Sequence, residues 1–156
     1  MKIAKHTKQL SGLIIDDDTT WATPLKIALE SQLGCQAKVC IQGDTGLMAI
    51  MSRKPSFIIL DWNMPGVLNG PAVLSIIRQK PSMDNVPILL ATSRDKYEDI
   101  KGMIELGADD YICKPTSLRK VVAIIASLLD RRQTETKAHK AARTYARSLV
   151  CENGIA

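Results

Sequence analysis

The chain has 156 residues, 46% of them hydrophobic and 24% charged, with a formal net charge of +5, which suits one globular domain with a short appendage. No stretch approaches the roughly 18 to 20 apolar residues of a membrane span, and no signal-peptide-like apolar run follows the basic N-terminus, so we expect a cytoplasmic protein. The four cysteines form no C-x-x-C pair and have no histidines at zinc-ligand spacing, which argues against a structural metal or a disulfide.

The first predicted strand and helix follow an N-terminal extension, residues 1–9. Residues 13–15 are an apolar run that predicts a short buried strand. Apolar residues then recur at helical spacing from Trp21 onward, which predicts a helix that ends at Gly34. Pro24 has to lie near the first turn of this helix, because deeper in it would break the hydrogen-bond ladder.

Strand and helix signals continue to alternate until about residue 130. The further predicted strands cover residues 37–41, 57–60, 86–91 and 111–113, and the further helices lie around residues 45–51, 73–77, 95–106 and 118–129. Five successive strand–helix units predict a parallel sheet with helices on both faces and right-handed crossovers. We therefore assign residues 10–130 to one α/β domain.

Polar residues follow four of the predicted strands, at the end where open α/β sheets bind ligands. In chain order these strand ends carry Asp16 and Asp17, Asp61, Thr92 and Ser93, and Lys114. Crowded carboxylates repel one another, and a lysine ammonium or a hard divalent cation such as Mg²⁺ relieves that cost. A carboxylate, a metal ion, a hydroxyl and an ammonium together form a phosphoryl-transfer site in which the carboxylate attacks phosphorus.

Four motifs containing these residues resemble the signatures of the response-regulator receiver family of two-component signalling. They are LIIDD at residues 13–17, IILDWNMP at 58–65, LLATS at 89–93 and YICKP at 111–115. They stand in the family's order and cover roughly residues 10 to 130. The resemblance implies a flavodoxin-like, doubly wound five-stranded parallel sheet with strand order 2-1-3-4-5.

The resemblance also implies a chemistry for the acidic residues. Asp61 would be the acceptor of a phosphoryl group from a phosphohistidine on a sensor histidine kinase or phosphotransfer protein. Mg²⁺ would be held by Asp17, by Asp61 and by the main-chain carbonyl of Asn63, with Asp16 acting through water. Such a receiver is a phosphorylation switch in a phosphorelay and has no enzymatic output of its own.

The remaining site residues are assigned by the same resemblance. Thr92 and Lys114 would contact the phosphoryl group, and Tyr111 matches the aromatic switch residue that turns inward when the threonine moves. An output partner would then bind on the Thr92/Tyr111 side. The peptide bond between Lys114 and Pro115 would be cis. Plain core packing is the competing interpretation of Tyr111.

The chain departs from the family pattern in the loop after Pro65. Residues 66–69 make this loop one residue longer than usual, and Asn69 replaces the common aspartate. Because the change lies on a loop, we expect phosphorylation to survive and the kinase-facing rim to differ. Asn63 and Arg94 occupy positions that in the family tune how fast water removes the phosphoryl group.

The C-terminal tail, residues 131–156, carries six basic and two acidic residues and accounts for most of the net charge. Its apolar residues have near-helical spacing, which is typical of a solvated helical extension. A basic amphipathic helix that contacts a partner, an acidic membrane or nucleic acid is the alternative. The tail is too short for a helix-turn-helix output domain.

Two other functions compete with the receiver. DDDTT at residues 16–20 matches the nucleophile motif of haloacid-dehalogenase-like phosphatases, with Asp16 as nucleophile and Asp109 and Asp110 as an acidic pair. In those enzymes the acidic pair follows the lysine, whereas here it precedes Lys114. The third hypothesis is that the chain is the receiver half of a longer response regulator whose output domain is absent.

Overall fold

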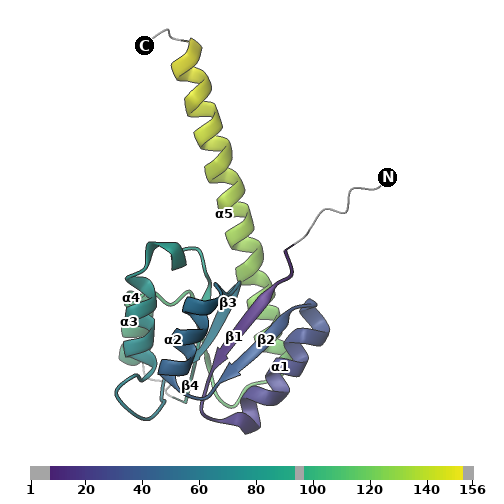
Figure 1. Ribbon diagram of the computed structural model, residues 1–156, viewed down its shortest axis with the longest axis vertical. Coiled ribbons are helices and arrows are strands. Elements are labelled where there is room, and N and C mark those ends of the chain that lie inside the picture. The colour runs from purple at the N-terminus through teal and green to yellow at the C-terminus, as the bar shows by residue number, and fades with distance from the viewer. Residues whose placement is uncertain (1–7, 94–96, 153–156) are drawn as a thin grey trace.

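The computed structural model describes residues 8–93 and 97–152, and its centre is a five-stranded parallel sheet (Figure 1). The strands are, in chain order, β1 (Ser11–Ile15), β2 (Gln36–Cys40), β3 (Phe57–Asp61), β4 (Ile88–Thr92) and β5 (Asp110–Cys113). They lie in the order β2-β1-β3-β4-β5, so the predicted fold and strand order are confirmed.

The position of each strand in the sheet explains its sequence. Every residue of β3 and β4 is buried, because both strands lie inside the sheet and are covered on both faces. The edge strand β2 instead has exposed residues alternating with more buried ones. The strand β4 begins at Ile88, later than the predicted residue 86, because Pro87 has no N–H group to donate to a neighbouring strand.

Helices cover both faces of the sheet in two layers (Figure 1). One layer contains α1 (Thr19–Leu33) and α5 (Leu118–Glu152), and the other contains α2 (Gly43–Ser52), α3 (Gly70–Arg78) and α4 (Tyr97–Glu105). A 3₁₀ turn, Pro81–Met83, connects α3 to β4. Successive side chains of a strand point to opposite faces, so Ile59 joins the core under α1 and α5, whereas Leu60 joins the core under α2, α3 and α4.

Helix α1 begins and ends at residues that suit its termini. The side chain of Asp18 accepts a hydrogen bond from the Thr20 main-chain N–H at 3.0 Å and caps the first turn. Gly34 ends the helix with φ at +62°, a left-handed conformation that favours glycine. Pro24 lies one turn deeper than we predicted. Because Thr20 and Pro24 are exposed, water can reach the main chain where the proline interrupts the ladder.

Helix α5 continues without a break past residue 130, where we expected the domain to end. At 1.5 Å per residue its 35 residues extend about 52 Å, and Figure 1 shows its later turns projecting away from the sheet. Arg132, just past the expected boundary, pairs with Asp109, the residue before β5. The first turn of the extension is therefore bound to the domain. None of the described helices is both long and apolar enough to span a membrane.

The segments that lead into β4 and β5 are held together by Arg78, the last residue of α3. Its guanidinium donates hydrogen bonds to the carbonyl oxygens of Gly107 at 2.8 Å, Met83 at 2.8 Å and Val86 at 3.1 Å. It also donates to the carboxylate of Asp109 at 2.9 Å. This side chain is only 15% exposed, so one residue satisfies four acceptors that water reaches poorly.

We predict that Arg78→Met lowers the free energy of unfolding by about 2–3 kcal/mol, because it removes four hydrogen bonds from poorly hydrated acceptors and leaves Arg132 as the only cation that the described residues pair with Asp109. Lys101→Met is the matched control, since the Lys101 side chain is exposed and pairs with the exposed Glu105 at 3.8 Å. That variant should change the stability by less than about 0.5 kcal/mol. Urea unfolding followed by circular dichroism measures both values, and equal losses would contradict the assignment.

Candidate functional site

The carboxyl ends of four strands meet at one edge of the sheet and carry the polar residues predicted from the sequence. Asp16 directly follows β1, Asp61 is the last residue of β3, and Thr92 is the last residue of β4. Lys114 follows β5, whose register places Cys113 opposite Thr92. Residues from four separated parts of the chain therefore converge because the strands that carry them are parallel and in register.

Three carboxylates form a cluster at this edge. One oxygen atom from each of Asp16, Asp17 and Asp61 lies within 4.8 Å of the other two. Asp16 is fully buried and Asp61 is 6% exposed, whereas Asp17 is exposed, so the cluster opens to solvent on the Asp17 side. All the donors are carboxylate oxygens, which are the ligands that hard divalent cations prefer. The cluster could therefore hold a divalent cation.

The ammonium of Lys114 supplies positive charge to the cluster. Its Nζ lies 2.6 Å from Oδ2 of Asp16 and 3.9 Å from Oδ1 of Asp61. The Lys114 side chain is 18% exposed, so these contacts are screened by water less than those of a surface pair. Lys114 also lies over the indole ring of Trp21, with Nζ 4.5 Å from the ring centroid. The ammonium thus has two carboxylates and an aromatic face around it.

Asp61 is less acidic than an ordinary aspartate. Burial of the carboxyl group is the main cause and raises its pKa from 3.8 to about 6. The N–H of Asn63 donates to Oδ1 of Asp61 at 3.1 Å and opposes the shift. The carboxylates of Asp16 and Asp17 raise the pKa further, and the Lys114 ammonium lowers it. The net result is a pKa for Asp61 that is shifted toward the neutral range.

The other predicted site residues lie on β4, on β5 and on the loop after β3. Thr92 is fully buried, and Tyr111 is half-buried and packs against the core under α2, α3 and α4. The side-chain amide of Asn63 donates to the hydroxyl of Ser93 at 2.8 Å, which connects the loop after β3 to the end of β4. The peptide bond between Lys114 and Pro115 is cis, as the resemblance implied. Arg94, predicted to tune dephosphorylation, lies outside the described residues.

The loop at residues 66–69 is anchored at its far end. The side chain of Asn69 accepts a hydrogen bond from the Ala72 N–H at 3.1 Å and caps α3, so asparagine serves as the helix cap here. Gly70 lets α3 start against the end of β3, because a Cβ atom there would lie 2.5 Å from the carbonyl oxygen of Asp61. Val67 is 91% exposed and stands out from the loop. The loop beside Asp61 therefore presents an apolar side chain to solvent.

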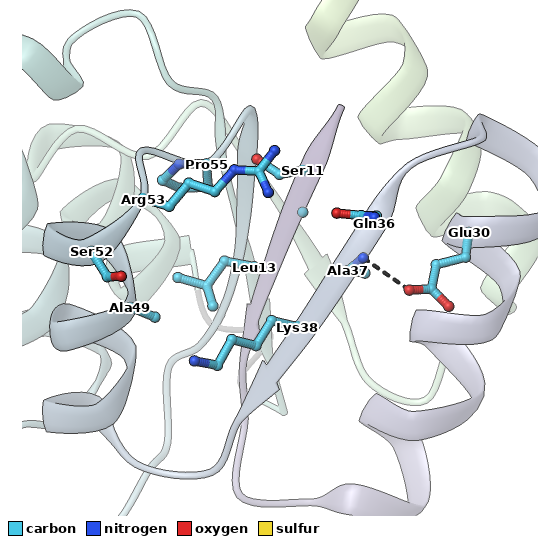
Figure 2. Close-up of a pocket in the computed structure, with 11 residues that line it drawn as sticks. Ser11, Leu13, Glu30, Gln36, Ala37, Lys38, Ala49, Ser52, Arg53 and Pro55 are labelled. Carbon is cyan, nitrogen blue, oxygen red and sulfur yellow. Dashed lines mark hydrogen bonds between the residues drawn. The ribbon is translucent and has the colours of Figure 1, made fainter. Parts of the chain in front are cut away.

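A pocket lies at the amino ends of β1 and β2, away from the carboxylate cluster and Lys114. It encloses about 430 Å³ between the end of α2 and the edge strand β2. Figure 2 shows Lys38 and Arg53 reaching across it from β2 and from the end of α2, with Leu13 between them. The residues that line it lie at the amino half of β1 and β2, whereas the polar strand-end residues lie at or just past the carboxyl ends of their strands.

Two contacts of the site were missed from the sequence. The helical spacing of Trp21 indicated an ordinary structural residue, yet its ring also faces Lys114. The bond between Asn63 and Ser93 joins residues 30 positions apart. The position of Trp21 in the first turn after the acidic loop was the one available signal, because that turn has to lie beside the strand ends.

Known proteins resemble this chain in sequence over most of its length. The family model described as the response regulator receiver domain matches residues 13–126. The transcriptional regulatory protein PrrA of Mycobacterium tuberculosis is 36% identical over 121 residues, which are 77% of this chain and 50% of PrrA. The phosphate regulon transcriptional regulatory protein PhoB of Rhizobium meliloti is 31% identical over 123 residues, 78% of this chain and 53% of PhoB. The chain thus spans about half the length of these relatives.

Solved structures resemble the chain in fold. A putative response regulator from Chloroflexus aurantiacus gives a TM-score of 0.72 at 29% identity, over 79% of this chain and 99% of that one. The receiver domain of the Francisella response regulator 1452 gives a TM-score of 0.72 at 28% identity, over 79% of this chain and 98% of that one. Nearly all of each solved chain is matched, so the common part is the whole receiver fold.

We predict that Asp61→Asn stabilises the metal-free protein at pH 7.5 by about 1–3 kcal/mol. The raised pKa of Asp61 means that the folded state holds this proton more tightly than the unfolded state, so stability falls as pH rises from about 4 to about 6. Asparagine carries no charge and avoids that loss. Thermal and urea unfolding in EDTA should show the advantage above pH 6 and none near pH 4.

Added Mg²⁺ should reduce the difference in stability between Asp61→Asn and the wild type at pH 7.5. A cation held by the carboxylate cluster stabilises the folded wild-type protein. An Asp61→Asn variant that is less stable than the wild type at pH 7.5 in EDTA would contradict the raised pKa.

Proposed function

The chain belongs to the response-regulator receiver family of two-component systems, and on this premise we propose that Asp61 is its phosphoryl acceptor. The observation that carries the proposal is the position of the Asp61 carboxylate at the end of β3, beside Asp16, Asp17 and Lys114. A buried carboxylate has to lie next to compensating positive charge if phosphate is to be placed on it. The phosphoryl donor would be a phosphohistidine on a sensor histidine kinase or phosphotransfer protein.

The transfer needs an ionised Asp61, which its pKa of about 6 provides at neutral pH. A carboxylate oxygen of Asp61 forms the bond to phosphorus as the bond from phosphorus to the donor imidazole nitrogen breaks. Asp17, Asp61 and the main-chain carbonyl of Asn63 would hold Mg²⁺, with Asp16 acting through water. When bound, the ion neutralises charge on the phosphoryl oxygens.

Two further residues act on the phosphoryl group in this proposal. The ammonium of Lys114, 3.9 Å from Asp61, moves to a phosphoryl oxygen and offsets its charge. The hydroxyl of Thr92, at the end of the neighbouring strand, donates to a second oxygen. Asn63 and Arg94 set how readily water reaches the phosphorus atom and removes the group.

The signal leaves the site through Thr92 and Tyr111. Thr92 is fully buried and Tyr111 is half-buried, so a shift of the threonine toward the phosphoryl group vacates space into which the ring can turn. Phosphorylation therefore shifts an equilibrium between two arrangements of this side of the domain. An output partner that prefers one arrangement binds there.

The proposed output of the receiver is a regulatory one. Both curated relatives named above are transcriptional regulators by name, and the chain matches about half of each. A receiver that controls an attached or separate regulatory output is consistent with that match. The helix α5 extends past the domain and is the route by which the receiver would reach such an output.

The phosphatase hypothesis is disfavoured by the position of Asp109. That residue precedes β5 and is paired with Arg78 and Arg132 at the amino ends of the strands. Asp16 lies past the carboxyl end of β1, at the opposite edge of the parallel sheet. Asp109 therefore cannot act together with Asp16 in one catalytic site.

We predict that acetyl phosphate with Mg²⁺ adds one phosphoryl group to the wild-type protein and none to Asp61→Asn, because the amide has no oxygen nucleophile of carboxylate strength. Asp130→Asn, an exposed residue of α5, is the matched control and should be labelled normally. Intact-protein mass spectrometry measures the 80 Da addition. Labelling of Asp61→Asn on the same peptide as the wild type would contradict the assignment.

The same variants separate the receiver from the phosphatase. We expect no catalytic turnover of p-nitrophenyl phosphate by the wild-type protein, because Asp109, which the phosphatase hypothesis pairs with Asp16, is held by Arg78 and Arg132 at the other end of the strands. Turnover that is lost in Asp16→Asn and kept in Asp61→Asn would favour the phosphatase.

A further inference from the structure

Lys114 is held by a residue that the proposed phosphoryl chemistry does not use. Its Nζ lies 4.5 Å from the centroid of the Trp21 ring while it pairs with Asp16 at 2.6 Å. Ammonium groups within about 6 Å of an indole face are attracted by the negative face of the ring. We propose that Trp21 is a positioning residue. It holds the Lys114 ammonium beside Asp16 in the unphosphorylated protein, which is the resting state of the switch.

The position of the ring does not depend on the lysine. Trp21 lies in the first turn of α1, where its main-chain N–H donates to the main-chain carbonyl of Asp18 at 3.2 Å. Its side chain packs against the core between α1 and α5. Its buried Nε1 has no hydrogen-bond acceptor among the described residues, so packing alone fixes the ring. Lys114 comes from a different element, the segment after β5, and can move relative to the ring.

The ring opposes the move that phosphorylation requires. In the resting arrangement Nζ lies closer to Asp16, at 2.6 Å, than to Asp61, at 3.9 Å. A phosphoryl group on Asp61 draws the ammonium toward its oxygens and away from the Trp21–Asp16 side. Any contact that is stronger in the resting state than in the phosphorylated state shifts the equilibrium toward rest. This step rests on the proposed function of Asp61.

The resting contact can be tested without phosphorylation. The lysine CεH₂ protons of Lys114 should be shifted upfield by the ring current in NMR spectra of lysine-labelled protein, relative to the exposed Lys54. Lys114→Arg identifies the resonance by removing it. Trp21→Phe keeps an aromatic face and should retain part of the shift, whereas Trp21→Leu should lose it. Absence of the shift in the wild type would overturn the proposal.

The effect on the switch is tested with beryllofluoride, a phosphoryl mimic, in the presence of Mg²⁺. Trp21→Leu should bind beryllofluoride about two- to fivefold more tightly than the wild type, because the resting contact is gone. Trp21→Phe should fall between the two, and circular dichroism checks that each variant is folded. Binding of beryllofluoride to the wild-type protein should also move the Lys114 CεH₂ resonance downfield, away from its ring-shifted position.

Unchanged or weaker binding of beryllofluoride by Trp21→Leu would overturn the proposal. Equal changes of affinity in Trp21→Leu and Trp21→Phe would also overturn it, because they would indicate a loss of packing. If the wild-type protein shows the ring-current shift but binds no beryllofluoride, the resting contact stands. The proposed function of Asp61 fails in that case, so the two failures are distinguishable.

Discussion

The ion pair between Lys114 and Asp16 is the interaction on which the rest of the site depends. Two of the three clustered carboxylates are buried, and a buried negative charge is stable only beside positive charge or strong hydrogen-bond donors. The ammonium sits 2.6 Å from one of them and 3.9 Å from the other. It therefore allows acidic residues to gather at one edge of the sheet while leaving Asp61 with a pKa of about 6.

The fold confines this chemistry to one edge because both faces of the sheet are already covered. Helices bury the whole length of β3 and β4, so polar side chains can only follow the strands at their ends. At the opposite end of the strands, Arg78 binds three carbonyls and Asp109 in the segments that lead into β4 and β5. Hydrogen bonds thus fix the amino ends of these two strands, and the carboxyl ends keep acidic groups that can respond to a ligand.

The sequence predicted the central elements well because their signals are local. The apolar runs ending at Asp16 and Asp61 become β1 and β3, and the family resemblance given by the four motifs is confirmed by the match over residues 13–126. The prediction was wrong for Pro24, because the rule that excludes proline from helix interiors has exceptions where the main chain is exposed to water. Pro24 lies one turn inside α1, because its missing hydrogen bond faces water and costs less there than in a core.

The sequence by itself determined which residues end the strands, since strand periodicity and the order of the motifs are properties of the chain. It therefore identified Asp61, Asp16, Asp17, Thr92 and Lys114 as one group. Only the tertiary structure decided which of them touch, and that Trp21 from α1 and Asn63 from the loop after β3 face Lys114 and Ser93 respectively. The physical reason is that a side chain's partner across the sheet depends on register and helix packing, and neither is encoded by spacing along the chain.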